Sequence, residues 1–124
     1  MAIEDGKRQR RQALERRTLE FAAQVLDFVL PLPQGPVRDV IGRQMLRSAT
    51  SIGANYREAN RAASRADFVS KVNIAEKEAS ETVYWLELCG LRSLGNDRLR
   101  PILLQEGGEL LAILVTIGKR AKSK

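Results

Sequence analysis

Four stretches of the sequence carry apolar side chains at alternating spacings of four and three residues, and this periodicity constrains the fold more than any other feature. An α-helix turns once in about 3.6 residues, so this spacing places the apolar side chains on one face. The clearest stripe lies in the second stretch: Val37, Ile41, Met45, Ala49, Ile52, Tyr56 and Ala59. No stretch alternates with the period of two that a strand requires. The sequence therefore predicts an all-α chain whose helices each bury one face.

Prolines separate the first two predicted helices. The stripe of the first helix begins at Leu14 and includes Thr18, Phe21, Val25 and Phe28. The helix is expected to stop at Leu30, because the prolines that follow remove backbone donors and disfavour helical geometry in the residues before them. The segment 31–36 is the expected loop. Its last residue, Pro36, suits the first turn of the second helix.

A turn is expected at residues 60–64, before the third helix. Ser64 followed three residues later by Asp67 resembles a capping box, which starts this helix at Arg65. Gly95 is expected to close the helix as its C-terminal cap. The core stripe of the helix is Phe68, Val72, Ala75, Ala79, Val83 and Leu86.

The last helix is expected to follow Asn96, which can cap it, with a possible kink at Gly107-Gly108. Its stripe is Leu99, Leu103, Leu110, Ile113 and Ile117. The polar ends, residues 1–12 and 119–124, are free to fray, although residues 1–12 could instead extend the first helix. Short connections between four helices predict one domain, residues 1–124, folded as an antiparallel up-and-down four-helix bundle.

Composition narrows the class of protein. The chain has 124 residues, of which 44% are hydrophobic and 29% charged, as in a soluble single domain. Asp27, Glu87 and Glu109 interrupt the longest apolar runs, so no membrane span is expected, and no secretory signal is recognisable. Cys89 is the only cysteine. An internal disulfide is therefore excluded, and the cytoplasm is the expected location.

The residues that catalysis usually needs are missing. The sequence has no histidine, its one cysteine lies in an apolar helical stretch, and its serines have no recognisable base. No glycine-rich phosphate loop occurs. We therefore expect a protein that is not an enzyme and that uses no cofactor.

Glu76, Glu78 and Glu81 raise the question of a metal site. Di-iron helical bundles combine inward glutamates with Glu-x-x-His pairs, and this chain cannot form such pairs. The expected role of Glu78 and Glu81 is ion pairing or hydrogen bonding with Arg47, Asn55 or Arg57 of the second helix. No metal ligands are predicted.

The net charge of +6 is unevenly distributed along the chain. It is +3, −2, +4, −3 and +4 over residues 1–17, 18–37, 38–66, 67–91 and 92–124. On the second helix the arginines lie opposite the apolar stripe, in a ladder suited to backbone phosphates. The candidate nucleic-acid-binding residues are Arg43, Arg47, Arg57, Arg61 and Arg65. A merely solvated basic surface is the alternative.

Other residues point to contacts between helices or subunits. Small and amide side chains flank the second stripe, where another helix can approach closely. The third helix has more apolar surface, around Tyr84 and Trp85, than two neighbours need, which favours a subunit interface. Alternatively, these two aromatic side chains cap the bundle core. The candidate contact residues are Ser48, Ser51, Asn55, Glu78, Glu81, Tyr84 and Trp85.

Two segments also resemble a known family. RSATSIGANYREA (residues 47–59) and SRADFVSKVNIAEKEASETVYWLEL (residues 64–88) are similar to the four-helix-bundle proteins encoded in intervening sequences of bacterial 23S ribosomal RNA genes, also called S23 ribosomal-like proteins. The resemblance implies a homopentameric ring, for which RNA association has been proposed. A related group, the accessory variability proteins of diversity-generating retroelements, is similar in fold and basic charge and works with a reverse transcriptase.

Two functions remain open from the sequence. The first is a non-catalytic homo-oligomer that binds RNA or DNA with low sequence specificity through its basic surface. The second is a structural ring that docks a protein partner, such as a reverse transcriptase, with no direct role in nucleic-acid binding.

Overall fold

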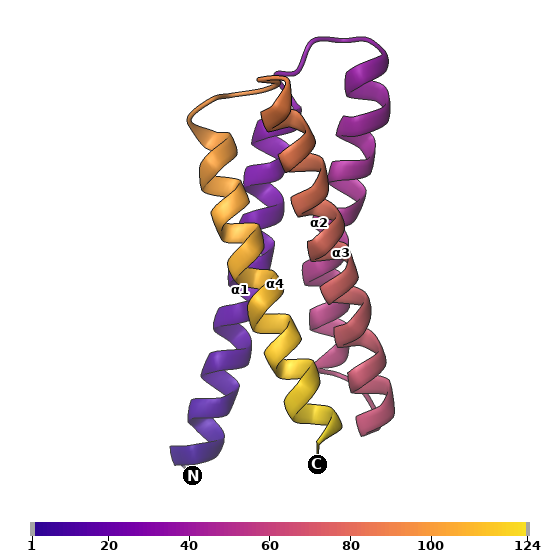
Figure 1. Cartoon of the computed structure of the whole chain (residues 1–124). Coiled ribbons are helices and arrows are strands. Elements are labelled where there is room, and N and C mark those ends of the chain that lie inside the picture. Colours follow the sequence, from indigo (N-terminus) through magenta and orange to yellow (C-terminus); the bar gives the residue numbers. More distant parts are fainter. Residues whose placement is uncertain (1, 124) are drawn as a thin grey trace.

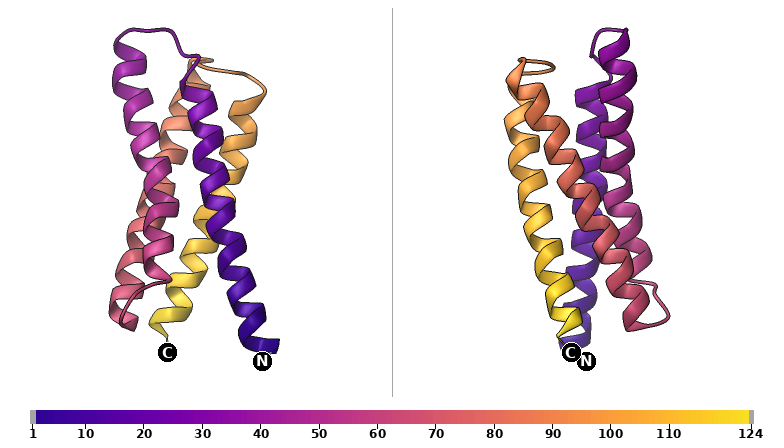
Figure 2. Two further views of the ribbon diagram at one scale, coloured as in Figure 1. Left: turned by 180° about the vertical axis from the view of Figure 1, so that it is seen from behind. Right: turned by 45° about the vertical axis from the view of Figure 1, so that its right-hand side comes forward.

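A computed structural model of the chain describes residues 2–123, where it has four α-helices and no strand. They are α1 (Ala2–Val29), α2 (Arg43–Ala59), α3 (Arg65–Leu91) and α4 (Leu99–Lys122). Successive helices run in opposite directions, as Figures 1 and 2 show, so the predicted all-α antiparallel bundle is confirmed for these residues. Met1 and Lys124, at the tips of the two ends expected to fray, lie outside the described residues.

Both chain ends lie at the same end of the bundle as the turn between α2 and α3 (Figure 1). We call this the lower end; it comprises residues 2–17, 57–71 and 113–123. Residues 2–12 extend α1, which is the second of the two possibilities that the sequence left open. The basic tail is helical through Lys122 rather than irregular.

Most of the core comes from the predicted stripes, but in α4 Leu114 is fully buried whereas Ile113 and Ile117 of the predicted stripe are only half-buried. The side chains of Phe21, Val25 and Phe28 in α1 are at most 1% exposed, and those of Met45, Ala49 and Ile52 in α2 are fully buried. α3 and α4 add further buried apolar side chains, namely Val72, Ala75, Ala79, Leu86, Cys89, Leu103, Leu110 and Leu114. Burial of these helix faces is the main contribution to stability, since isolated helices are marginal in water.

The start of the second helix differs from the prediction in one respect. The chain is helical from Pro36, as expected, but Arg38–Gly42 forms a π-helical turn before α2 begins. A π-helical turn contains more residues than an α-helical turn, so the side chains before it are rotated about the helix axis relative to those of α2. Val37, the first residue of the predicted stripe, is therefore exposed, and the buried position goes to Gly42.

The end of α3 also differs from the prediction. Gly95 was expected to cap the helix, but α3 ends at Leu91 and Ser93 adopts the left-handed conformation, with φ of +54°. The Leu94 amide donates to the Cys89 carbonyl at 2.9 Å, and the Ser93 amide donates to the Gly90 carbonyl at 3.3 Å. These two bonds form a Schellman motif, which satisfies carbonyls at the end of the helix. Gly95 lies beyond it, in the connection to α4.

The side-chain caps predicted at Ser64 and Asn96 are confirmed, although α4 itself begins at Leu99, three residues after Asn96. The Asp67 amide donates to Ser64 Oγ at 3.1 Å, so Ser64 is the N-cap of α3. Asn96 Oδ1 accepts from the backbone amides of Arg98 and Leu99 at 2.8 and 2.9 Å. In both cases a side-chain oxygen satisfies amides that have no partner within the helix.

Gly107 and Gly108, where a kink was considered possible, do not interrupt α4, which is one continuous helix from Leu99 to Lys122. A Cβ atom on Gly107 would lie 3.2 Å from Val83 Cγ2 and 3.3 Å from Phe21 Cζ. Gly107 therefore lets α4 approach both α1 and α3 closely.

By length and composition, α4 could also cross a membrane, contrary to the sequence-based expectation; it is the one such helix in residues 2–123. Core helices of soluble proteins meet the same criterion. Here Leu103, Leu110 and Leu114 of α4 pack into the bundle core.

We predict that Cys89 reacts with thiol reagents only when the protein unfolds. Cys89 is fully buried, and burial raises the pKa of its thiol, although nearby Arg100 opposes this shift. Because the unfolded thiol, with a pKa of about 8.5, ionises at a lower pH than the folded thiol, ionisation favours unfolding. The stability contributed by the buried thiol is therefore complete below the unfolded pKa and is lost as the pH rises through the folded pKa. Denaturant midpoints should therefore fall above about pH 8.5. Cys89→Ala should reduce this slope, and fast labelling of the native protein would contradict the prediction.

Candidate nucleic-acid interface

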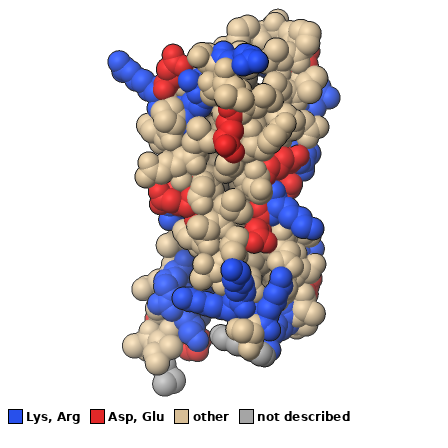
Figure 3. Space-filling view, viewed as in Figure 1, with Lys and Arg blue, Asp and Glu red and all other residues tan. Residues whose placement is uncertain are grey.

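The basic segments of the sequence converge at the lower end of the bundle. The antiparallel topology places the start of α1, the end of α2 and the end of α4 there, and each is rich in Lys and Arg. Figure 3 shows these blue side chains gathered over the lower part of the face that it displays. Charges that are distant in the sequence thus combine into one positive surface, which attracts polyanions.

Arg47, one of the predicted nucleic-acid ligands, is engaged within the bundle. Its Nη1 donates to Glu78 Oε2 at 2.7 Å, and its Nη2 forms a close ion pair with Glu81. These carboxylates raise the pKa of Arg47, mainly through the hydrogen bond to Glu78. The ion pairing predicted for Glu78 and Glu81 therefore occurs, and it joins α2 to α3. Within residues 2–123, no three His, Cys, Asp or Glu side chains, Glu76 included, lie close enough together to hold a metal ion.

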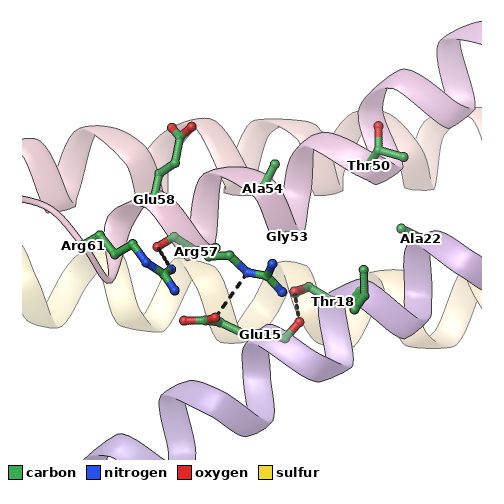
Figure 4. A pocket seen from close by; sticks show the side chains of 10 residues that line it. Glu15, Thr18, Ala22, Thr50, Gly53, Ala54, Arg57, Glu58 and Arg61 are labelled. Carbon is green, nitrogen blue, oxygen red and sulfur yellow. Dashed lines mark hydrogen bonds and ion pairs between the residues drawn. The ribbon is translucent and has the colours of Figure 1, made fainter.

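Arg57 lies in the last turn of α2 and Arg61 in the turn that follows it, both beside α1 (Figure 4). Arg57 Nε is 3.3 Å from Glu15 Oε1, and Arg61 Nη1 donates to the Arg57 carbonyl at 3.1 Å. The helices are close here because Gly53 has no side chain; a Cβ atom there would lie 2.8 Å from Thr18 Oγ1. Gly53, the one glycine inside α2, thus permits the contact between α1 and α2.

The two other predicted ligands lie at opposite ends of the bundle. Arg43 is the first residue of α2, at the upper end, and its side chain is exposed. Arg65 is the first residue of α3, at the lower end, and is also exposed. The five predicted arginines therefore do not form one surface. Arg57, Arg61 and Arg65 belong to the lower end, whereas Arg43 and Arg47 lie farther up.

The small polar residues of α2 make different contacts. Ser48 and Thr82 are fully buried, and their hydroxyl oxygens are 2.7 Å apart across the α2–α3 contact. Ser51 and Asn55 instead donate within α2, to the carbonyls of Arg47 and Ser51 at 2.7 and 2.8 Å. Of the three flanking residues, Ser48 alone bonds across the contact. Thr82 was not predicted, because its partner is 34 residues away.

Tyr84 and Trp85 occupy different environments on α3. Trp85 is half-buried and packs against the core, whereas Tyr84 is 58% exposed. Their rings are 5.1 Å apart in an edge-to-face arrangement. Leu91, farther along α3, is 74% exposed. Trp85 therefore belongs partly to the core, and Tyr84 and Leu91 leave apolar surface in contact with solvent.

α1 and α4 cross near their middle and separate toward the lower end (Figures 1 and 2). Gly107 of α4 packs against Phe21 of α1, since a Cβ atom on Gly107 would lie 3.3 Å from Phe21 Cζ. Beside this contact, Arg17 Nε and Nη2 donate to the two carboxylate oxygens of Glu106 at 2.7 and 2.6 Å, and Nη2 also contacts Glu109 at 3.0 Å. These bonds raise the pKa of Arg17, chiefly through Glu106. Such two-pronged pairing fixes the relative position of two helices.

A groove of about 630 Å³ opens between α1 and α4 below this crossing. The volume is in the range of ligand clefts, roughly 300–1,000 Å³. The half-buried side chains of Leu14, Phe68, Ile113 and Ile117 form its apolar floor. We call this cavity the basic groove because of the side chains at its rim.

The rim of the basic groove carries Lys7, Arg10, Arg11 and Arg120, all exposed. None of these four forms an ion pair with another described residue, and no carboxylate lines the groove. They were not among the predicted site residues. The charge distribution along the sequence indicated that both chain ends are basic. It could not show that the two ends lie side by side in the folded protein.

The fold and the site define a small four-helix bundle with one basic end. The chain belongs to the 23S rRNA-intervening sequence protein family, whose model matches residues 10–115. It is also similar to a crystal structure of a protein of unknown function from the S23 ribosomal protein family of Bacteroides thetaiotaomicron VPI-5482. The two are 39% identical over 88% of this chain and 97% of that chain, with a TM-score of 0.77. No match was found among curated proteins.

Proposed function

We propose that this protein is a non-catalytic, homo-oligomeric, cytoplasmic protein that binds RNA or other nucleic acid through its lower end. The observation that carries the proposal is the set of unpaired cations around the basic groove, Lys7, Arg10, Arg11 and Arg120. Cations already paired with carboxylates gain little from a phosphate, whereas unpaired ones bind it and release its counterions. Contacts to phosphates imply low sequence specificity.

A non-catalytic role is supported by the side chains present. The sequence contains no histidine, and its single cysteine is buried with a raised thiol pKa, which disfavours the reactive thiolate. Self-association is supported by the apolar side chains exposed on α3, including Ile74, Tyr84 and Leu91. Five subunits is the number that the family resemblance implies.

The proposal is tested by charge removal at each end of the bundle. The lower-end variant replaces Lys7, Arg10, Arg11 and Arg120 by alanine. The matched control removes the same charge at the upper end by replacing Arg38, Arg43, Arg92 and Arg98. Fluorescence anisotropy with a generic RNA should show a loss of roughly tenfold or more for the lower-end variant only. The slope of log affinity against log salt concentration should also become shallower, by up to about 0.7–0.9 for each phosphate that the variant no longer binds.

Light scattering during size exclusion, with and without RNA at low salt, gives the oligomeric state in the same experiment. A ring of about five subunits that binds RNA and releases it at high salt is expected. A ring that ignores RNA, together with co-purification of a defined protein at moderate salt, would support the scaffold function instead. A loss of affinity confined to the control variant would place the interface at the upper end.

A further inference from the structure

The floor of the basic groove does not suit a ligand made of phosphates alone. Leu14, Phe68 and Ile117 line the same groove as the cationic side chains, and they are half-buried against the core rather than fully buried in it. A phosphate placed against apolar surface loses hydration without gaining a hydrogen bond, so an apolar floor does not favour phosphate contacts. The groove instead combines an apolar surface with cations, which fits a ligand that has both an apolar face and negative charge.

The two components of the groove come from one continuous helix face. In α1 the buried stripe that contains Phe21 and Thr18 continues through Leu14 to Arg11 and Lys7, at helical spacing. Above the crossing with α4 this face packs into the core, and below it the same face lines the groove. The crossing of α1 and α4 therefore determines where the basic groove opens. Gly107 allows the close approach, and Arg17 with its two glutamates holds the helices in register.

We infer that the basic groove binds unpaired nucleotides, with a base against Phe68 and its aliphatic neighbours and the flanking phosphates on Lys7, Arg10, Arg11 and Arg120. This inference rests on the proposed function and names its ligand class, single-stranded nucleic acid. Proteins commonly bind single strands by combining a positively charged groove with aromatic side chains on which the bases stack, and Phe68 supplies such a ring in this groove. A duplex keeps its base faces stacked inside, so it can use the rim but not the floor.

The test compares a single-stranded RNA with a duplex of the same length and sequence, at one low salt concentration. Anisotropy should show at least tenfold tighter binding of the single strand. Phe68→Leu keeps the floor apolar but removes the flat ring, and should weaken single-strand binding by about 5- to 100-fold while leaving duplex binding within twofold. Ile117→Gln, at a half-buried position, is a second variant with the same expected direction. Circular dichroism establishes that both variants fold.

A 2-aminopurine base in the single strand gives a readout that a merely structural role of Phe68 would not change. Its fluorescence should be altered on binding to the native protein, and this change should be lost with Phe68→Leu. Equal binding of single strand and duplex, unaffected by both variants, would overturn the inference and leave the proposed function standing. Binding of neither RNA would overturn both. Binding only to vesicles of an anionic phospholipid would also overturn both.

Discussion

Gly95→Ala should lower the free energy of unfolding by roughly 3 kcal/mol, a large part of the stability of a domain this size. Gly95 has a φ of +80°, which side-chain-bearing residues rarely adopt. An added Cβ atom would also lie 2.3 Å from Cζ of Phe28, a fully buried ring in the core. Phe28 is only 1% exposed and belongs to the core, so its ring has little room to move away, and backbone strain and a steric clash act together.

Gly108→Ala is the matched control for this prediction. Gly108 lies in the middle of α4, and an added Cβ atom there would have no neighbour within 4 Å. Alanine should therefore stabilise the protein by about 0.5–1 kcal/mol, since it favours the helix. Urea denaturation followed by circular dichroism measures both variants. Equal midpoints for the two would show that the contact between Gly95 and Phe28 is not tight in solution.

Arg47→Met should lower the free energy of unfolding by about 1–3 kcal/mol and leave RNA affinity nearly unchanged. Arg47 is half-exposed, but Glu78 and Glu81 are only 15% and 33% exposed. Without the guanidinium, two partly buried carboxylates three residues apart on α3 repel each other and lack a counter-charge. Methionine keeps the aliphatic length of the side chain, so the loss reports on charge.

Combining replacements of Arg47 and of its two glutamate partners isolates the contribution of these ion pairs to stability. In the Arg47→Met background, Glu78→Gln together with Glu81→Gln should recover most of the lost stability, because the neutral amides need no cation. The denaturant midpoint and the RNA affinity are measured on the same samples. If Arg47→Met unfolds at the native midpoint but loses RNA affinity, Arg47 contacts phosphate and is not a structural residue.

Measuring the denaturant midpoint together with the RNA affinity distinguishes arginines that stabilise the bundle from those proposed to bind nucleic acid. The sequence grouped Arg43, Arg47 and Arg57 because they share a helix face. In the folded chain, Arg47 and Arg57 are held by glutamates of α3 and α1. A ladder on one helix is therefore a poor guide to a binding surface when neighbouring helices supply carboxylates.

Much of the fold was predictable because the local signals agreed with one another. The 3–4 spacing indicated the buried faces, and Pro31, Ser64 and Asn96 placed the helix boundaries to within a few residues. The prediction failed where tertiary packing, rather than local sequence, determines the backbone conformation. The π-turn at Arg38–Gly42 and the left-handed Ser93 have no distinctive residue type, so no pattern of side chains indicated them.

The sequence by itself determined that the chain forms four amphipathic helices, that it carries an excess of positive charge and that it contains no histidine. Only the tertiary structure decided which cations are unpaired and where they meet. The ion pairs that engage Arg17 and Arg47 join residues 31 to 92 positions apart, and the basic groove brings together Lys7 and Arg120. Helix formation depends on neighbours within a turn, whereas pairing and clustering of charge depend on how the helices cross.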